Sequence, residues 1–330
     1  MSEPILVTGG AGFIGSHLVD RLLADGGSVT ILDDFSTGHE ANVSAHPSTA
    51  PLRVVRGSVT DERLVDTLVA EHPLVFHLAA AVGVAHIMSD PVASLHTNVR
   101  GTENVLAAAH RYGSRVVLAS TSEIYGRSTE VPFKETANRV LGPTWIHRWS
   151  YSTSKAVDEH LAFAYAEQGL RVSIVRYFNS YGPRIDERGY GSVIARFVTQ
   201  ALSGEPITVH GDGQQTRCFT YVTDTVEGTV LAARRKEALG NVFNIGSAEE
   251  VTIRDLAERI RRMLGSASQL TLVPYEAAYP TGFQDTPRRV PDLGRARDVL
   301  GYSPTVSLDA GLALTLAWCR AHYAAAGERR

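Results

Sequence analysis

The sequence predicts an α/β fold in which a parallel β-sheet is covered by helices on both faces. Short apolar runs alternate with helical segments from the N-terminus onward. A glycine-rich turn joins the first apolar run to the first helix. The chain has 330 residues, 44% of them hydrophobic, which is enough for one large domain or two unequal ones.

Composition narrows the possible functions. The net charge of −3 and the pI near 6.5 give no basic field, so nucleic acid is not expected as a partner. Cys218 and Cys319 cannot form a disulfide framework and are expected to be small buried residues of a reduced, cytoplasmic protein. We find neither a secretory signal before Ile5 nor a segment apolar enough to span a bilayer, so no membrane association is expected.

The first strand and turn predict a dinucleotide site. Residues 5–8 form a short apolar run, as a buried parallel strand requires, and glycines follow at positions 9, 12 and 15 before a helix. Glycines let the backbone N–H groups approach a pyrophosphate at the helix N-terminus. The sheet should therefore be of the doubly wound Rossmann type.

The next strands refine the choice of cofactor. A second apolar run, residues 29–32, ends at Asp33-Asp34. A carboxylate there can accept both ribose hydroxyls and repels a 2′-phosphate, so we expect NAD rather than NADP. Two further strands, 52–56 and 74–78, end in small residues that leave room for a flat cofactor.

Histidine positions do not predict a metal site. His77 lies inside an apolar run and is expected to be a hydrogen-bonded core residue. His72 and His86 show no ligand spacing with the cysteines, so no metal is expected.

Hydroxyls and a carboxylate gather after the fifth strand, 116–119, at Ser120-Thr121-Ser122-Glu123. Active sites of parallel sheets lie at such strand ends. Tyr151 and Lys155, four residues apart, share one helix face. A free tyrosine has a pKa of about 10, which a nearby ammonium and a positive nicotinamide ring would lower. The phenolate could then remove the proton of an alcohol that Thr121 also binds, while hydride leaves the same carbon.

The chain resembles the extended short-chain dehydrogenase/reductase family, specifically the NAD-dependent epimerases and dehydratases of nucleotide sugars. The resemblance covers nearly the whole chain. It rests on the motifs at 8–15, 77–80, 98–102, 120–126, 151–155, 176–183 and 211–224.

The resemblance implies a set of NAD contacts and a set of substrate contacts. For NAD these are Gly9, Gly12, Phe13, Ile14, Gly15, Asp33, Ser36, Thr37, Gly38, Gly57, Ser58, Val59, Leu78, Ala79, Ala80, Asn98, Ser120, Tyr151, Lys155 and Tyr177. For the UDP-sugar they are Asn179, Arg184, Arg188, Val193, Val209, Arg217, Arg288 and Arg289. Arg217 is expected to pair with the diphosphate. The NAD-binding domain should span residues 1–178, with the chain returning to it around 220–247, and residues 179–330 should form a smaller substrate domain.

The resemblance also frames the reaction. In this family hydride leaves the sugar C4 and a 4-ketone forms. Dehydratases carry Asp-Glu where this chain has Ser122-Glu123, which disfavours dehydration. Residues 148–155 and 282–291 resemble the bacterial decarboxylases of lipid A modification, in which the Thr-Ser-Glu group and an arginine serve a uronate. Thr121, Ser122, Glu123 and Arg289 match those positions.

Two outcomes remain for such a uronate. An epimerase must clamp the carboxylate and turn the keto-sugar, and Arg184, Arg188 and Ser122 could form that clamp. Residues 184–191 also differ from the corresponding stretch in the decarboxylases. We therefore expect a UDP-glucuronate 4-epimerase, with oxidative decarboxylation as the alternative. Dehydration and a non-catalytic NAD sensor are less favoured.

Two helical segments predict self-association. Residues 92–111 and 151–167 carry apolar side chains on more than one face. In the family it resembles, two such helices per subunit form a four-helix interface, which implies a homodimer.

Overall fold

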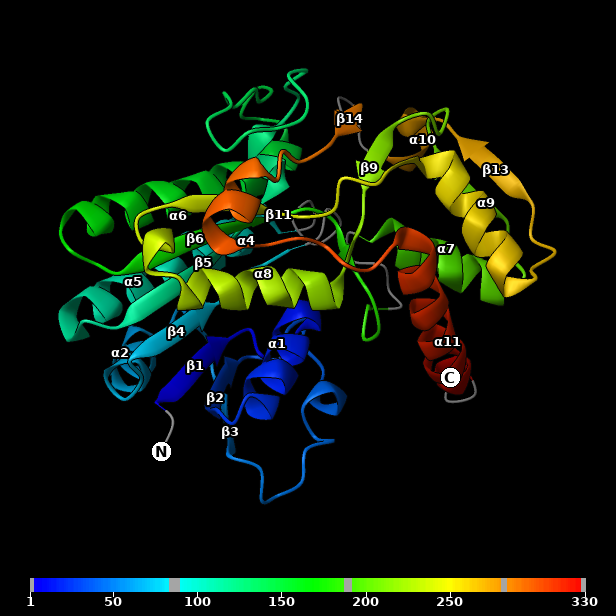
Figure 1. Cartoon of the computed structure of the whole chain (residues 1–330). Helices are drawn as coiled ribbons and strands as arrows, with labels where there is room; N and C mark the ends of the chain where they lie inside the picture. Colours follow the sequence, from blue (N-terminus) through cyan, green and yellow to red (C-terminus); the bar gives the residue numbers. More distant parts are fainter. Residues whose placement is uncertain (1–2, 83–89, 187–191, 280–283, 328–330) are drawn as a thin grey trace.

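A seven-stranded parallel sheet forms the centre of the computed structural model, which describes residues 3–82, 90–186, 192–279 and 284–327 (Figure 1). The strand order is β11-β6-β5-β4-β1-β2-β3. The strands are β1 (Pro4–Thr8), β2 (Ser28–Asp33), β3 (Leu52–Arg56), β4 (Leu74–His77), β5 (Arg115–Thr121), β6 (Val172–Tyr177) and β11 (Val242–Ile245). From the centre of the sheet, β1, β2 and β3 follow one another to one edge, and β4, β5, β6 and β11 to the other. This reversal of direction confirms the predicted doubly wound α/β fold.

Helices cover both faces of this sheet because its strands are apolar on both sides. Val116 and Leu118 of β5 pack into one hydrophobic cluster, whereas Val117 between them packs into the other. The first cluster includes helices α2 (Glu62–Ala70), α5 (Gly101–Tyr112) and α6 (Ser150–Glu167). The second includes α1 (Phe13–Ala24) and α8 (Val222–Arg234). A short helix α4 (Pro91–Leu95) leads into α5 through a π-turn, η2 (His96–Arg100).

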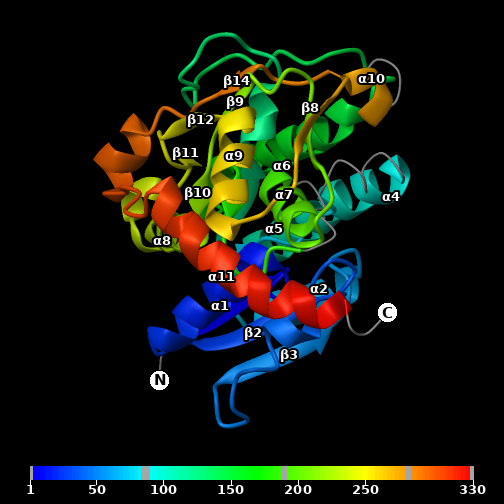
Figure 2. The ribbon, with the colours of Figure 1, turned by 90° about the vertical axis from the view of Figure 1, so that its right-hand side faces the viewer.

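A third hydrophobic cluster lies beside the sheet. It joins α7 (Val193–Leu202), α9 (Ile253–Leu264) and α11 (Leu308–Gly327), which pack together in the turned view of Figure 2. Short strand pairs border it. They are β8 (Ile207–His210) with β13 (Leu270–Val273), β7 (Ser180–Tyr181) with β10 (Thr220–Tyr221), and β9 (Thr216–Cys218) between β12 (Glu250–Thr252) and β14 (Arg288–Arg289). The remaining turns are η1 (Glu40–Asn42), η3 (Ser122–Tyr125), η4 (His147–Trp149), η5 (Lys236–Ala238), α10 (Tyr275–Ala278) and η6 (Ala296–Leu300).

A buried polar network holds α6, β5, β6 and β11 together. The Arg176 guanidinium on β6 donates to both Glu159 oxygens, at 2.9 and 2.7 Å. Glu159 also accepts from the Ser120 hydroxyl at 2.5 Å. Arg176 donates to the Tyr125 hydroxyl at 2.8 Å, and that hydroxyl donates to Asn244 of β11 at 2.6 Å. Burying these groups is tolerated because each charge has a partner.

Loss of Glu159 should strongly destabilise the fold. Glu159→Ala leaves the Arg176 guanidinium buried without its carboxylate, which typically costs about 3–5 kcal/mol. The free energy of unfolding, measured by urea denaturation, should fall by that amount. The half-exposed pair of Arg21 and Glu227, joined at 2.6 Å, is the control, because Glu227→Ala should cost less than about 1 kcal/mol. Equal losses in both variants would contradict the role given to the network.

Candidate active site

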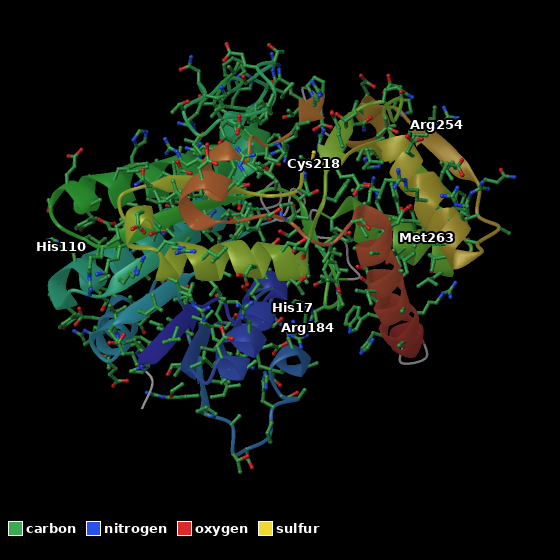
Figure 3. The ribbon with its side chains drawn as sticks, viewed as in Figure 1. His17, His110, Arg184, Cys218, Arg254 and Met263 are labelled. Atoms are coloured by element: carbon green, nitrogen blue, oxygen red, sulfur yellow. The ribbon has the colours of Figure 1, made fainter. Side chains whose placement is uncertain are left out.

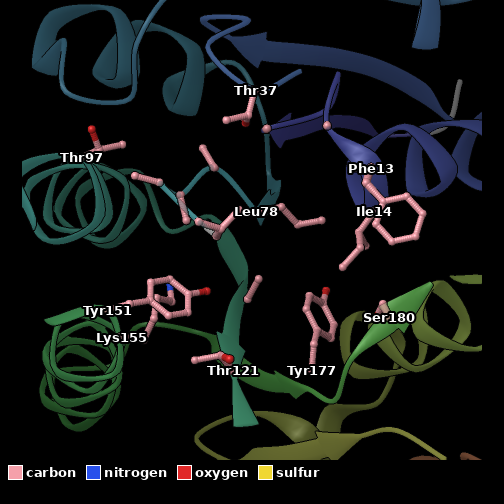
Figure 4. Close-up of a pocket in the computed structure, with 18 of the residues that line it drawn as sticks. Phe13, Ile14, Thr37, Leu78, Thr97, Thr121, Tyr151, Lys155, Tyr177 and Ser180 are labelled. Carbon is pink, nitrogen blue, oxygen red and sulfur yellow. The ribbon is translucent and has the colours of Figure 1, made fainter. Parts of the chain in front are cut away.

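A pocket of about 610 Å³ opens at the carboxyl ends of the strands. Figure 4 shows residues from both halves of the chain around it, among them Phe13, Thr121, Tyr151 and Ser180. Since parallel strands end at one edge, the loops after β1, β2, β4, β5 and β6 all reach it.

The glycine loop forms a cradle that admits no side chain. Gly9 has φ = 71°, and a Cβ there would lie 2.7 Å from the Ala79 nitrogen. A Cβ on Gly15 would lie 2.0 Å from the Gly9 carbonyl oxygen. The loop thus brings its backbone to the pocket at the start of α1, as a pyrophosphate site requires.

Asp33 both orders this loop and faces the pocket. Its Oδ2 accepts from the Ala11 N–H at 2.9 Å and its Oδ1 from the Phe35 N–H at 2.8 Å. Burial raises the pKa of Asp33, and these backbone hydrogen bonds oppose that rise. Each oxygen keeps a lone pair, so the carboxylate can accept ribose hydroxyls while it fixes the turn. The fit to the adenosine half of NAD is therefore good.

The other predicted cofactor residues separate into two groups. Those that line the pocket include Gly12, Phe13, Ile14, Ser36, Thr37, Gly57, Val59, Leu78, Ala79, Ala80, Ser120 and Tyr177. Gly38 packs against Asp33, whereas the Ser58 hydroxyl bonds with Thr60. Asn98 accepts from the Ala81 N–H at 2.7 Å and donates to Ser154 at 3.1 Å, so it fixes the loop after β4 rather than facing the pocket.

The catalytic candidates converge on one side of the pocket. Thr121, Ser122 and Glu123 end β5, and Tyr151 and Lys155 extend from α6. The Thr121 side chain lies close enough to the Tyr151 hydroxyl to lower the pKa of Tyr151. A substrate alcohol between these two hydroxyls would meet both a proton acceptor and a hydrogen-bond partner.

The electrostatics of Tyr151 differ from the prediction. The Lys155 ammonium lies 2.7 Å from Asp158. Burial, followed by the charges of Glu123 and Asp158, raises the pKa of Tyr151, while Thr121 and Arg148 lower it. The structure by itself therefore does not show the lowered pKa that we expected from Lys155. Bound NAD supplies the hydride acceptor and, when oxidised, a positive ring that favours the phenolate.

Two buried arginines enclose Glu123. Its carboxylate lies 2.5 Å from Arg148 and 2.7 Å from Arg289, which comes from β14. Burial alone would raise the pKa of Glu123, but the two guanidiniums outweigh burial and hold the pKa well below its usual range. Glu123 is thus a fixed carboxylate rather than a proton donor in this arrangement.

The predicted substrate residues are only partly brought together. Asn179 and Arg289 line the pocket. Arg217 is buried nearby and pairs with Asp285 at 2.8 Å. Val209 is buried in the cluster around α7, and Val193 packs against that cluster.

The predicted carboxylate clamp is not assembled. Arg184 pairs with Asp20 of α1 at 2.7 Å and lies beside His17 in Figure 3, so it does not meet Ser122. Arg288 is exposed and pairs with Glu250 at 2.7 Å. Arg188 and His86 lie outside the described residues.

Two functional residues were missed by sequence reasoning. Arg148 lines the pocket, and its position three residues before Tyr151 was a usable signal. Asp158 follows Lys155 by three residues, but only the structure shows that it is buried.

The remaining sequence expectations can be compared with the described part of the chain. His77 is a core residue, bonded to Thr8 at 2.7 Å and Thr102 at 3.1 Å, as predicted, and both cysteines are buried. Within the described ranges no helix is long and apolar enough to cross a membrane, and no cluster of three or more metal-ligating side chains occurs.

Comparison with known proteins identifies the family. Residues 5–246 match the model of the NAD-dependent epimerase/dehydratase family. The chain is 43% identical to UDP-N-acetyl-alpha-D-glucosaminuronate decarboxylase of Bacillus cytotoxicus, over 97% of this chain and 98% of that one. It is 38% identical to UDP-glucuronic acid decarboxylase 1 of Xenopus tropicalis, over 96% and 72% of the two chains.

A solved structure agrees with the fold. UDP-glucose 4-epimerase of Thermotoga maritima, crystallised with UDP-glucose, superposes with a TM-score of 0.87 at 32% identity and covers 97% of this chain and 99% of its own. The glycine cradle, Asp33 and the pair of Tyr151 and Lys155 stand where an NAD-dependent oxidation needs them. The chain therefore belongs to the NAD-dependent epimerase/dehydratase family of extended short-chain dehydrogenases/reductases.

Proposed function

We propose that the protein decarboxylates a UDP-hexuronate through a 4-keto intermediate. One observation carries this proposal: two buried guanidiniums, from Arg148 and Arg289, face the single carboxylate of Glu123 in the pocket wall. Two positive charges against one negative leave a positive surplus. A substrate carboxylate would balance it.

The place of this surplus points to the sugar rather than to the diphosphate. Arg148 and Glu123 are close enough to Tyr151 for their charges to act on its hydroxyl. Because Tyr151 must contact the oxygen at C4, the carboxylate at C5 of a uronate falls within reach of the two arginines. Arg217, which we assign to the diphosphate with Asn179, has Asp285 as its own partner.

The reaction follows from these positions. The Tyr151 phenolate takes the C4 hydroxyl proton while the C4 hydrogen leaves as hydride to bound NAD. The product is a β-keto acid. Its C5–C6 bond breaks, CO2 leaves, and the bonding electrons enter the ketone as an enolate, which is protonated at C5. Return of hydride to C4 gives a UDP-pentose. Release at the ketone stage leaves NADH instead.

This proposal replaces the 4-epimerase that the sequence suggested. An epimerase must hold the carboxylate while the sugar turns, and we had assigned Arg184 and Ser122 to that task. Arg184 instead pairs with Asp20, away from Ser122. The named relatives with the higher identities are decarboxylases of UDP-uronates, which supports decarboxylation.

We also infer a homodimer. Val92 and Leu95 of α4 and Val157 of α6 are apolar yet 68%, 37% and 37% exposed. Helices α4 and α6 are in contact, so these side chains can form one apolar face, which a second copy of the chain would cover.

The proposed activity is tested by incubating the protein and NAD with UDP-glucuronate or UDP-N-acetylglucosaminuronate. CO2 release with a UDP-pentose or its 4-ketone is the expected result. The absorbance of NADH distinguishes the two products, because NADH accumulates only when the 4-ketone is released. A C4-epimerised uronate formed without CO2 would show that the carboxylate is retained.

Arg289→Gln should weaken binding of the uronate. Loss of a charged hydrogen bond of about 1.5–3 kcal/mol corresponds to a KM about 10- to 150-fold higher, with NAD binding unchanged. Arg288→Gln is the matched control, because Arg288 is exposed and pairs with Glu250 outside the pocket. KM values raised equally in both variants would argue against the role given to Arg289.

Val157→Glu should dissociate the dimer, because it places a charge at the centre of the apolar face. Multi-angle light scattering should give twice the chain mass for the wild type and one chain mass for the variant. Leu272→Glu, at a half-exposed position on β13, is the control. A monomeric wild type would refute the dimer.

A further inference from the structure

Asp158 is a buried charge that the reaction described above does not use. It lies on α6, three residues after Lys155, and its side chain is fully buried. Its Oδ2 stands 2.7 Å from the Lys155 Nζ, and the lysine side chain is only 3% exposed. The pair is therefore shielded from water and from salt.

Among the described residues, Asp158 is the carboxylate within ion-pair distance of Lys155. Burial, helped by the Lys155 charge, lowers the pKa of His77 to about 3, so its ring is neutral. That ring is fixed between Thr8 and Thr102 by hydrogen bonds of 2.7 and 3.1 Å.

The neighbouring carboxylate, Glu159, serves a different cation. It is bound by Arg176 at 2.7 Å and by the Ser120 hydroxyl at 2.5 Å. Asp158 thus has its charge directed to Lys155, the cation with which it forms an ion pair.

We propose that Asp158 is a positioning residue for the proton-transfer pair: it fixes the Lys155 ammonium, and its charge influences the pH at which Tyr151 begins to act as a base. The three residues form one stripe along α6, because spacings of four and three residues keep side chains on one helix face. The proposal goes beyond the fate of the 4-ketone and holds for any substrate alcohol that Tyr151 deprotonates.

The direction of the effect follows from charge alone. A negative charge makes proton loss harder at every neighbouring group. At Tyr151, Glu123 and Asp158 act in that direction, whereas Arg148 and the Thr121 hydrogen bond oppose them. At Lys155 the facing groups are Asp158 and the neutral His77. Asp158 therefore shifts the deprotonation of Tyr151 to higher pH.

The test is the pH profile of kcat/KM for Asp158→Asn, which removes the charge at nearly constant shape. Tyr151 must be ionised, so the profile has an acidic limb. That limb should move to lower pH in the variant. The displacement should be smaller than the roughly 1–3 units that an adjacent charge causes, because about two helical turns separate Tyr151 from Asp158.

Matched variants separate this effect from a structural one. Asp158→Glu keeps the charge and should restore the acidic limb. Asp298→Asn removes an exposed aspartate of η6, which pairs with Arg297, and should leave the profile unchanged. A lower rate with an unmoved acidic limb in Asp158→Asn would overturn the proposal, because a merely structural role changes the amplitude only.

Lysine NMR gives a second test that needs no substrate and no variant of Asp158. The chain has three lysines, Lys134, Lys155 and Lys236, so ¹⁵N-lysine spectra of the wild type can be assigned with Lys134→Arg and Lys236→Arg. The Lys155 ammonium should exchange slowly and have a distinct shift. A Lys155 signal like those of the other two lysines would overturn the proposal even if the decarboxylase assay succeeds. A shielded Lys155 would support it even if that assay fails.

Discussion

The site depends on one constraint, which is that all seven strands of the main sheet run in the same direction. Their carboxyl ends share one edge, so residues far apart in sequence meet there. The glycine loop after β1, Asp33 after β2, Ala79 after β4 and Thr121 at the end of β5 all reach one pocket. Gly9 lies so close to Ala79 that a side chain at position 9 would clash. The bare backbone there borders the space for a flat cofactor.

The segment that carries Arg289 into the pocket is held in place by contacts outside the main sheet. Arg289 comes from β14, which pairs with β9 and lies outside the main sheet. The chain just after it is tied to the loop at Phe133, whose N–H donates to the Val290 carbonyl at 2.8 Å. Asn244, a member of the Glu159–Arg176 network, donates to the Phe133 carbonyl at 2.8 Å. The buried network thereby connects the sheet to the segment that carries Arg289.

Local patterns explain what the sequence could predict. The glycine spacing, Asp33 and the pair of Tyr151 and Lys155 are short-range motifs, and each lies where it was expected. Strand β6 was less visible, because Ser173 and Arg176 interrupt its apolar run. Both are buried, and Arg176 has its partner, Glu159, on another element. Arg184 was misplaced for a related reason, since its partner Asp20 is 164 positions away in the chain.

The proposed function gives ion pairing a role in substrate choice. An arginine balanced by its own carboxylate, as Arg217 is by Asp285, can bind an anion only by sharing its donors. Arg148 and Arg289 share one carboxylate, so an additional anion lowers the energy of the buried cluster. Under this proposal a neutral hexose would leave that surplus charge uncompensated, whereas a uronate would neutralise it. The preference for a uronate would then come less from the shape of the pocket than from a charge that the described residues do not balance by themselves.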